Sequence, residues 1–300
     1  MSTITLIDAT VVASKSDEGH RAHLGASVIG RNCSRQIWYM HHWAKRPEFE
    51  GRIYRLFDRG HREEPALVAY LKQAGITVHD VNPETGEQFR VSDLGGHFGG
   101  SMDGCGIGFP ERPDVWHVLE FKTHGDKSFK ALAKAGVQVS KPEHYAQMQV
   151  YMHYTSMLHA CYIAVNKNDD HLHVEFVKYD EAAALSTIEK ARMIIEAPTP
   201  PERIGGPDWF VCRFCDFREI CHQAEIPERN CRTCIHSDPV MTGTSGKWSC
   251  AAGNEMGDGR EPLPCHRLNP KMFNTTVVGV DGGDIDHGRF IDTGPGSEKV

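Results

Sequence analysis

The order of sequence patterns along the chain predicts a mixed α/β fold, with a central mixed sheet flanked by helices. One long helical segment comes first, followed by four short strand-like segments, two helices, two more strands and a last helix. Helices and strands interleaved in this way, with no fixed repeat, are typical of layered α/β domains. A cysteine-rich segment follows the last helix, so we also expect a small C-terminal module.

Each expected element rests on its own pattern. A helix over residues 52–74 carries the apolar set Leu67, Val68, Tyr70 and Leu71. The remaining elements are strands at 77–78, 88–91, 97–103 and 115–123, helices at 127–135 and 142–158, strands at 160–165 and 172–179, and a helix at 181–196 that stops before Pro198. The glycines of residues 104–108 are interpreted as a hairpin turn, because Phe109-Pro110 rather than a helix follows them.

The chain divides into four predicted parts. Residues 1–24 are an N-terminal extension and residues 25–225 are the core domain, which ends in a Pro-rich linker at 197–207 and the first group of cysteines. Residues 226–272 form the C-terminal cysteine module. Residues 273–300 are an acidic, Gly-rich tail that we expect to be disordered.

Composition excludes several classes of protein. The 300 residues include 40 acidic and 33 basic ones, and the formal charge of -7 argues against a generally basic nucleic-acid binder. No apolar run is long enough to span a membrane, and no basic residue precedes the apolar N-terminus, so we expect an intracellular, cytoplasmic protein. In a reducing compartment, the 10 cysteines are expected to bind metal rather than form disulfides.

Positive charge is nevertheless concentrated in one segment. Residues 31–62 hold eight basic and three acidic side chains, interleaved with Trp38, Trp43, Tyr54 and other aromatics. Such a pattern suits a polyanion whose bases can stack, although a solvated helix face with aromatics in the core would look the same.

The most informative stretch is Gly99-Gly-Ser-Met-Asp-Gly104, followed by Leu119-Glu-Phe-Lys-Thr123. Residues two apart on a strand share a face, so Glu120 and Lys122 project together. Asp103 ends a neighbouring strand, and two carboxylates brought together would make an oxygen site for Mg²⁺ or Mn²⁺, beside a lysine that could orient the attacking water. The alternative is a surface Glu120–Lys122 pair with Asp103 in a turn.

Other residues at helical spacing support the first interpretation. Gln147 and Tyr151 share one face of their predicted helix, as do His61 and Glu64 on the earlier helix. The candidate DNA contacts are basic residues in two places, before the predicted helix at 52–74 and just after the Glu120 strand. They are Arg31, Arg35, Lys127, Lys130 and Lys134.

The cysteines form two constellations. Cys212, Cys215 and Cys221 give three thiolates within ten positions, and the isolated Cys33 is the candidate fourth ligand. The second set is Cys231, Cys234, Cys250 and Cys265, a zinc-ribbon-like pattern in which His236 or His266 could replace one thiolate. Cys105 and Cys161 fit neither pattern and are expected in the core.

The acidic residues, the lysine and the two helical pairs described above resemble the motifs of the PD-(D/E)xK nucleases, in particular of the RecB-like and CRISPR-associated exonuclease branch. Gly60-His61, Asp103, Glu120-Phe121-Lys122 and Gln147-Met-Gln-Val-Tyr151 match that branch's motifs in order, over about residues 25–225. The resemblance implies a restriction-endonuclease-like core in which His61, Asp103, Glu120 and the Phe121 carbonyl hold the divalent metal. Lys122 would then position the water, while Gln147 and Tyr151 support the lysine and the DNA backbone.

A second similarity adds an alternative ligand. Gly60-His-Arg-Glu-Glu64-Pro65 is similar to a motif of lambda-exonuclease-like (YqaJ) nucleases, which makes Glu64 a candidate beside His61. One departure from the superfamily pattern is Met102 in front of Asp103, where the "PD" half has proline. Since only the acid does the chemistry, this departure puts little in doubt.

The resemblance also extends to the first cysteine set. Relatives with one early cysteine and a late C-x2-C-x5-C bind a 4Fe-4S cluster, which implies such a cluster at Cys33, Cys212, Cys215 and Cys221; zinc is the alternative there. The second set would form a zinc knuckle that needs its metal to fold.

The resulting expectation is a Mg²⁺- or Mn²⁺-dependent deoxyribonuclease, acting as an exonuclease in recombination, repair or phage DNA processing. Its partners would be DNA ends and a recombination, CRISPR or phage protein, with no membrane. The alternatives are a non-catalytic, metal-stapled DNA-binding module, an endonuclease of the same superfamily, or action on RNA. Lambda-type relatives form rings, but the motifs leave oligomeric state, strand preference and polarity open.

Overall fold

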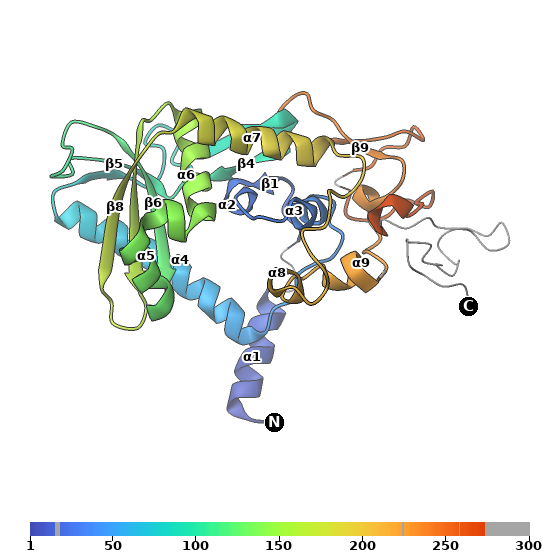
Figure 1. Ribbon diagram of the computed structural model, residues 1–300, viewed down its shortest axis with the longest axis horizontal. Coiled ribbons are helices and arrows are strands. Elements are labelled where there is room, and N and C mark those ends of the chain that lie inside the picture. The colour runs from blue at the N-terminus through green and yellow to red at the C-terminus, as the bar shows by residue number, and fades with distance from the viewer. Residues whose placement is uncertain (16–18, 224, 258, 274–300) are drawn as a thin grey trace.

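A computed structural model describes residues 1–15, 19–223, 225–257 and 259–273 (Figure 1). Its helices are α1 (Thr3–Ser14), α2 (Ala26–Ile29), α3 (Ser34–His41), α4 (Gly51–Gln73), α5 (Asp126–Ser140), α6 (Pro142–Thr155), α7 (Glu181–Glu196), α8 (Phe210–Arg213) and α9 (Arg218–Gln223). Its strands are β1 (Leu24–Gly25), β2 (Thr77–His79), β3 (Arg90–Asp93), β4 (Phe98–Ser101), β5 (Gly104–Ile107), β6 (His117–His124), β7 (His159–Asn166), β8 (Leu172–Lys178), β9 (Ser237–Pro239) and β10 (Trp248–Cys250). The fold is mixed α/β, with mixed sheets flanked by helices, as the sequence predicts.

The main sheet has the strand order β2-β5-β6-β7-β8. Strands β6 and β7 are parallel and the other neighbours are antiparallel, which makes the sheet mixed. One face packs Leu119 and Phe121 of β6 against Leu67 and Val68 of α4. The opposite face of β6, which begins with Val118, belongs to the cluster formed with α5, α6 and α7. Alternation along β6 therefore sends Glu120 and Lys122 toward the α5–α6 side.

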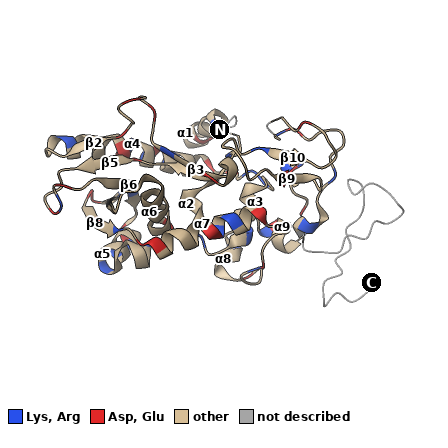
Figure 2. Cartoon of the chain, turned by 90° about the horizontal axis from the view of Figure 1, so that it is seen from above, with Lys and Arg blue, Asp and Glu red and all other residues tan. Residues whose placement is uncertain are grey.

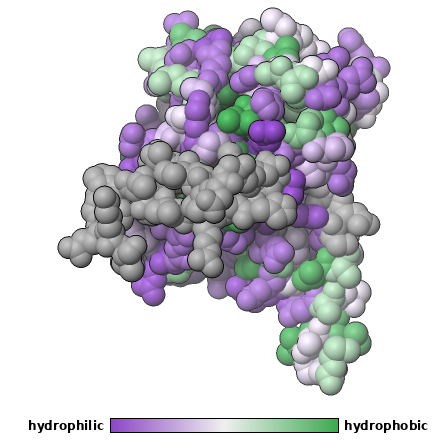
Figure 3. All heavy atoms as spheres, turned by 90° about the vertical axis from the view of Figure 1, so that its right-hand side faces the viewer, coloured by the Kyte–Doolittle hydropathy of each residue, from purple (hydrophilic) through white to green (hydrophobic). Residues whose placement is uncertain are grey.

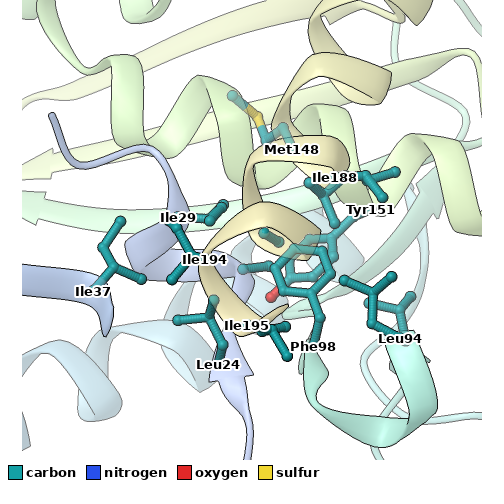
Figure 4. Packing of buried hydrophobic residues seen from close by; sticks show 14 of the residues in the cluster. Leu24, Ile29, Ile37, Leu94, Phe98, Met148, Tyr151, Ile188, Ile194 and Ile195 are labelled. Atoms are coloured by element: carbon teal, nitrogen blue, oxygen red, sulfur yellow. The ribbon is translucent and has the colours of Figure 1, made fainter. Parts of the chain in front are cut away.

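A second, three-stranded sheet, ordered β1-β4-β3, adjoins the main one. Its strands and helices α2, α3 and α7 enclose the larger hydrophobic cluster. Figure 4 shows Phe98 of β4 and Tyr151 of α6 beside Ile194 and Ile195 of α7 in this cluster. Helix α6 is thus buried between the two sheets, and it places its polar residues next to strands.

Local signals explain where the helices around the site begin and end. Pro142 opens α6, a position where a missing N–H costs nothing, and Ser156 ends it in a left-handed conformation. The Asp180 carboxylate caps α7 by accepting a hydrogen bond from the Ala183 N–H. Residues 197–207, the expected linker, form neither helix nor strand.

Three sequence expectations need correction. Residues 104–107 are strand β5 rather than a hairpin turn, and Asp103 lies in the bend between β4 and β5 rather than on a strand. The first error arises because residues 104–107 are held as a strand by pairing with β2 on one side and β6 on the other, which the local glycine pattern does not show. The helix expected over 127–135 is α5, which continues to Ser140 after Gly136 leaves helical geometry (φ 73°) close to the expected end.

Helix α1 was not expected from the sequence. It packs along α4, where the Asp8 carboxylate pairs with Arg55, and none of its residues is buried. Figure 3 shows it projecting from the bottom of the molecule with apolar side chains on its surface, among them Ile4, Leu6 and Ile7. In the part of the chain that the structure describes, no helix is both long and apolar enough to cross a membrane. The predicted tail, from residue 274 on, lies outside the described residues.

Candidate active site

The β6 strand and the bend before β5 bring the two predicted carboxylates together. The backbone N–H of Phe121 donates a hydrogen bond to the Asp103 carboxylate (2.8 Å), so Asp103 lies against the middle of the Glu120-Phe-Lys122 stretch. Burial raises the pKa of Asp103, while Lys122 and the Phe121 N–H act in the opposite direction. An acid that is desolvated beside another acid is primed to take a cation.

Glu120 is the most deeply buried charged group of this site. Its side chain is 0% exposed and forms an ion pair with the Lys122 ammonium, whose side chain is 29% exposed. Burial raises the pKa of Glu120 to about 7, and the Asp103 and Glu64 carboxylates add to this effect. Burial alone would lower the pKa of Lys122, but the carboxylates of Glu120 and Asp103 raise it overall. Lys122 also donates to the Phe121 carbonyl (3.2 Å).

Helix α4 contributes both alternative metal ligands. His61 and Glu64 line a cleft of about 470 Å³ together with Phe121 and Lys122. The pKa of Glu64 is raised by burial and then by the Asp103 carboxylate. The cleft therefore has an acid and an imidazole on α4 facing the β6 residues, and both remain candidates.

Gln147 and Tyr151 hold the backbone that carries Asp103. The Tyr151 hydroxyl donates to the Ser101 carbonyl (2.8 Å), and the Gln147 amide nitrogen donates to the Tyr151 oxygen (3.3 Å). Gly100 makes room for this contact, since a Cβ there would lie 2.6 Å from the Tyr151 oxygen. Tyr151 is 2% exposed, so its position supports a structural role under Asp103 and leaves its predicted contact with DNA without support.

Three residues near Lys122 were not predicted. The Tyr162 hydroxyl lies 2.9 Å from His124 Nε2 and 2.8 Å from His144 Nδ1, which joins β7 to β6 and α6. Burial is the main cause of a lowered pKa in both histidines. The pKa of His124 falls to about 4, with Lys141 and Lys122 adding to the effect of burial. The pKa of His144 falls to about 3, with Lys122 and His124 adding to it. A signal was present in the sequence: His124 is two residues after Lys122 on the same strand, and His144 lies three before Gln147 on the same helix.

The predicted DNA contacts fall in different environments. Lys127, Lys130 and Lys134 are exposed on α5, at the end of the molecule away from β9 and β10 (Figure 2). Lys130 is paired with Asp126 (2.8 Å) and Arg31 with Glu143 (3.9 Å).

Arg35 departs from the prediction. It is 1% exposed and donates to the carbonyls of Pro200 and Pro201 (3.4 and 3.0 Å), so its guanidinium does not face a ligand in solution. Its predicted role as a DNA contact is therefore not supported. The charge pattern of residues 31–62 cannot distinguish such a buried arginine from the exposed ones.

The first cysteine set is brought together across the chain. Cys33, Cys212, Cys215 and Cys221 line one small cavity, together with Arg35. Cys33 caps α3, where its sulfur accepts the Gln36 N–H (3.4 Å). Burial raises the pKa of Cys215 to about 11, so metal binding there has to displace a proton. The buried Arg35 provides a positive charge that would offset thiolates.

The second cysteine set also shares one cavity. Cys231, Cys234, Cys250 and Cys265 line it with His236 and His266. The segment is tied to the core by Arg232, whose guanidinium lies 3.5 Å from the centre of the Trp43 ring and donates to the His41 carbonyl (3.1 Å). Backbone hydrogen bonds, first from Asn254, lower the pKa of Cys250. Cys105 and Cys161, expected in the core, are both buried.

The candidate metal ligands do not converge on a single point in the carboxylate site or in either cysteine set, as the described residues are placed. Among residues 1–15, 19–223, 225–257 and 259–273, no three His, Cys, Asp or Glu side chains are placed closely enough to hold a metal ion. In the carboxylate site, Glu120 turns to Lys122 instead of sharing a point with Asp103 and Glu64. Metal binding at each site would therefore require the side chains to rotate.

The raised pKa of Glu120 predicts how stability depends on pH in magnesium-free protein. A carboxyl whose folded-state pKa lies near 7 instead of about 4.5 favours the folded state below pH 4.5, and this contribution is lost as pH rises through 7. By linkage, the loss is about 3 kcal/mol. We expect thermal unfolding of the wild type to shift down between pH 5 and 8 by more than that of Glu120→Gln. Glu189→Gln, which removes an exposed carboxyl, is the control. Equal shifts in the wild type and Glu120→Gln would contradict this prediction.

Comparisons with known proteins give only distant structural similarity. No family profile matches the sequence, and no curated protein is significantly similar to it. The crystal structure of SSO0001 is 16% identical with a TM-score of 0.41, covering 74% of this chain and 96% of that one. LHK-Exo in complex with dAMP is 15% identical (TM-score 0.40; 63% and 90%), and the alkaline exonuclease LHK-Exo from Laribacter hongkongensis is 15% identical (0.39; 62% and 90%). Similarities at this level carry no argument about function, which has to rest on the site.

Proposed function

We propose that this chain is a Mg²⁺- or Mn²⁺-dependent deoxyribonuclease of the PD-(D/E)xK superfamily, with a restriction-endonuclease-like core. One observation carries the proposal: the Asp103 carboxylate is bonded to the Phe121 N–H, between Glu120 and Lys122. Two acids and a lysine on neighbouring backbone, with His61 or Glu64 across the cleft, are the kinds of groups needed for metal-assisted phosphodiester hydrolysis.

The residues divide the chemistry between them. A divalent ion, when bound by Asp103, Glu120, the Phe121 carbonyl and His61 or Glu64, polarises the scissile phosphate and lowers the pKa of the attacking water. The raised pKa of Lys122 keeps it protonated at neutral pH, so it acts as a hydrogen-bond donor and positive charge for the transition state. With Glu120 serving as a ligand of the ion, the Lys122 ammonium would be available to the phosphate.

The remaining assignments extend this proposal. The enzyme would trim DNA ends as an exonuclease in recombination, repair or phage DNA processing, in the cytoplasm and with a protein partner of that process. A 4Fe-4S cluster at the first cysteine set and zinc at the second, in a C-terminal knuckle, would hold the chain's ends against the core. The shared cavities of the two cysteine sets support this assignment.

A second candidate function is a non-catalytic DNA-binding module. The observation that favours it is the ion pair of the fully buried Glu120 with Lys122, which gives the carboxylate a counter-charge without a metal. Such a protein would bind DNA but leave it uncut.

An end-labelled DNA digestion separates the two functions. Wild type and Glu120→Ala are incubated with single- and double-stranded DNA in Mg²⁺, Mn²⁺ or EDTA. We expect cleavage that needs the metal and is lost in the variant, with the label that disappears first giving the polarity. Intact DNA in every lane, together with retarded DNA in a gel, would replace the nuclease by the binding module.

A further inference from the structure

A pocket next to the cleft has no part in the chemistry described above. It measures about 660 Å³ and is lined by Phe49, Tyr54 and Phe57, which we call the aromatic pocket, and by basic residues from the segment around β1 and α3. Its volume lies within the range of ligand-binding pockets in proteins. Phe57 and His61 line both this pocket and the active-site cleft, so the two spaces adjoin.

The three rings of the aromatic pocket pack edge to face. The ring centres of Phe49 lie 5.7 Å from those of Tyr54 and 5.2 Å from those of Phe57, and the Tyr54 and Phe57 centres are 6.3 Å apart, with planes at 87–90°. The Phe57 side chain is 43% exposed, so part of its ring is open to a ligand in the pocket. Uncovered aromatic faces are the surfaces on which nucleobases stack.

One face of α4 joins the pocket to the candidate metal ligands. Tyr54, Phe57, His61 and Glu64 follow each other at spacings of three, four and three residues, which places them in a single stripe along the helix. The seven steps along the helix from Tyr54 to His61 cover about 10 Å of helix axis. A stacked strand rises about 3.4 Å per nucleotide, so this length corresponds to about three nucleotides.

The charge of the pocket suits a phosphate backbone. Among the described residues, the lining includes the basic side chains of Arg21, Lys45 and two others and the acidic side chain of Asp58. Lys45 forms ion pairs with Glu219 and Glu225 (3.7 and 3.4 Å), and Lys15 forms one with Asp58 (3.6 Å), so part of this positive charge is neutralised within the protein. Aromatic faces beside positive charge are the combination found in grooves for single strands.

The stacking surfaces also discriminate between single-stranded and duplex DNA. In a duplex, both faces of every internal base are covered by its neighbours, so only an unpaired base can stack on a protein ring. We infer that the aromatic pocket binds the unpaired nucleotides of a single-stranded DNA segment and leads its backbone along α4 to the cleft. This inference rests on the proposed nuclease function for its direction, but the binding itself does not require cleavage.

The test is the affinity for fluorescein-labelled oligonucleotides in EDTA, measured by anisotropy. Tyr54→Ala and Phe57→Ala are each expected to weaken binding of a 20-nucleotide single strand by about tenfold, as loss of one stacked base does, and to change duplex binding by less than about twofold. Tyr70→Ala is the matched control, because Tyr70 is an exposed aromatic (60%) on the same helix outside the pocket. Tyr54→Leu keeps the apolar bulk without the ring and should lose affinity as Tyr54→Ala does.

Each outcome decides for or against the inference. Unchanged single-strand affinity, or equal losses for single strand and duplex in variants that melt like the wild type, would overturn it. Cleavage by the wild type together with normal binding by Tyr54→Ala would keep the nuclease and remove the pocket. Selective loss of single-strand binding in a protein that never cuts would keep the pocket and remove the nuclease.

Discussion

Replacing Lys122 by Met is expected to reduce DNA cleavage by about 10²- to 10⁴-fold while leaving DNA binding within about twofold. The methionine keeps the apolar stem of the lysine but removes the ammonium that faces Glu120 and Asp103. That ammonium is the donor and positive charge that the proposed mechanism places beside the phosphate. The measurement is the single-turnover cleavage rate at saturating Mn²⁺, so that substrate binding does not limit it.

The control for this variant is Lys178→Met, which removes an exposed lysine on the edge strand β8, outside the candidate site. It should cut at the wild-type rate. The fold of Lys122→Met should survive, because burial already raises the pKa of Glu120 and the unpaired carboxyl can take up a proton. Cleavage by Lys122→Met at the wild-type rate would remove the lysine from the chemistry.

The double variant Glu120→Gln/Lys122→Met tests whether the two residues act as a unit. Groups that work in one step are strongly non-additive, so the double variant should cut about as slowly as the slower single variant.

Much of this site could be predicted because the relevant information is local. The i, i+2 spacing of Glu120 and Lys122 fixes their shared face on any strand, and the i, i+4 spacing of Gln147 and Tyr151 does the same on a helix. The position of Asp103 follows from the pairing of β5 with β6, in which Gly104 lies opposite Leu119.

Other features depend on contacts between distant segments, which spacing does not encode. Residues 104–107 form a strand because they pair with β2 on one side and β6 on the other. Arg35 is buried because the linker carbonyls at Pro200 and Pro201 fold over it. The link from His124 through Tyr162 to His144 crosses three elements, so only its separate spacings were visible in the sequence.

The Cys33→Ser variant is expected to lose the metal of the first cysteine set and to unfold at a temperature lower by about 10 °C or more. Cys33 lies about 180 residues before Cys212, and the four cysteines nevertheless line one cavity. A ligand shared across so long a loop restricts the unfolded chain, by about 5 kcal/mol in the loop-entropy account that applies to disulfides. Cys105→Ala is the matched control, because Cys105 is buried in the core away from both cysteine sets.

The metal analysis of the same samples decides which group the cavity holds. Anaerobically purified wild type should contain iron and absorb broadly near about 400 nm, and Cys33→Ser should lose both the iron and the absorbance while keeping zinc at the second set. A colourless wild type with two zinc ions would assign zinc to the first set and leave the cross-link in place. If Cys33→Ser keeps both its metal content and its melting temperature, Cys33 is not a ligand. In that case the Cys33 sulfur does no more than accept the Gln36 N–H, and a hydroxyl can replace it at little cost.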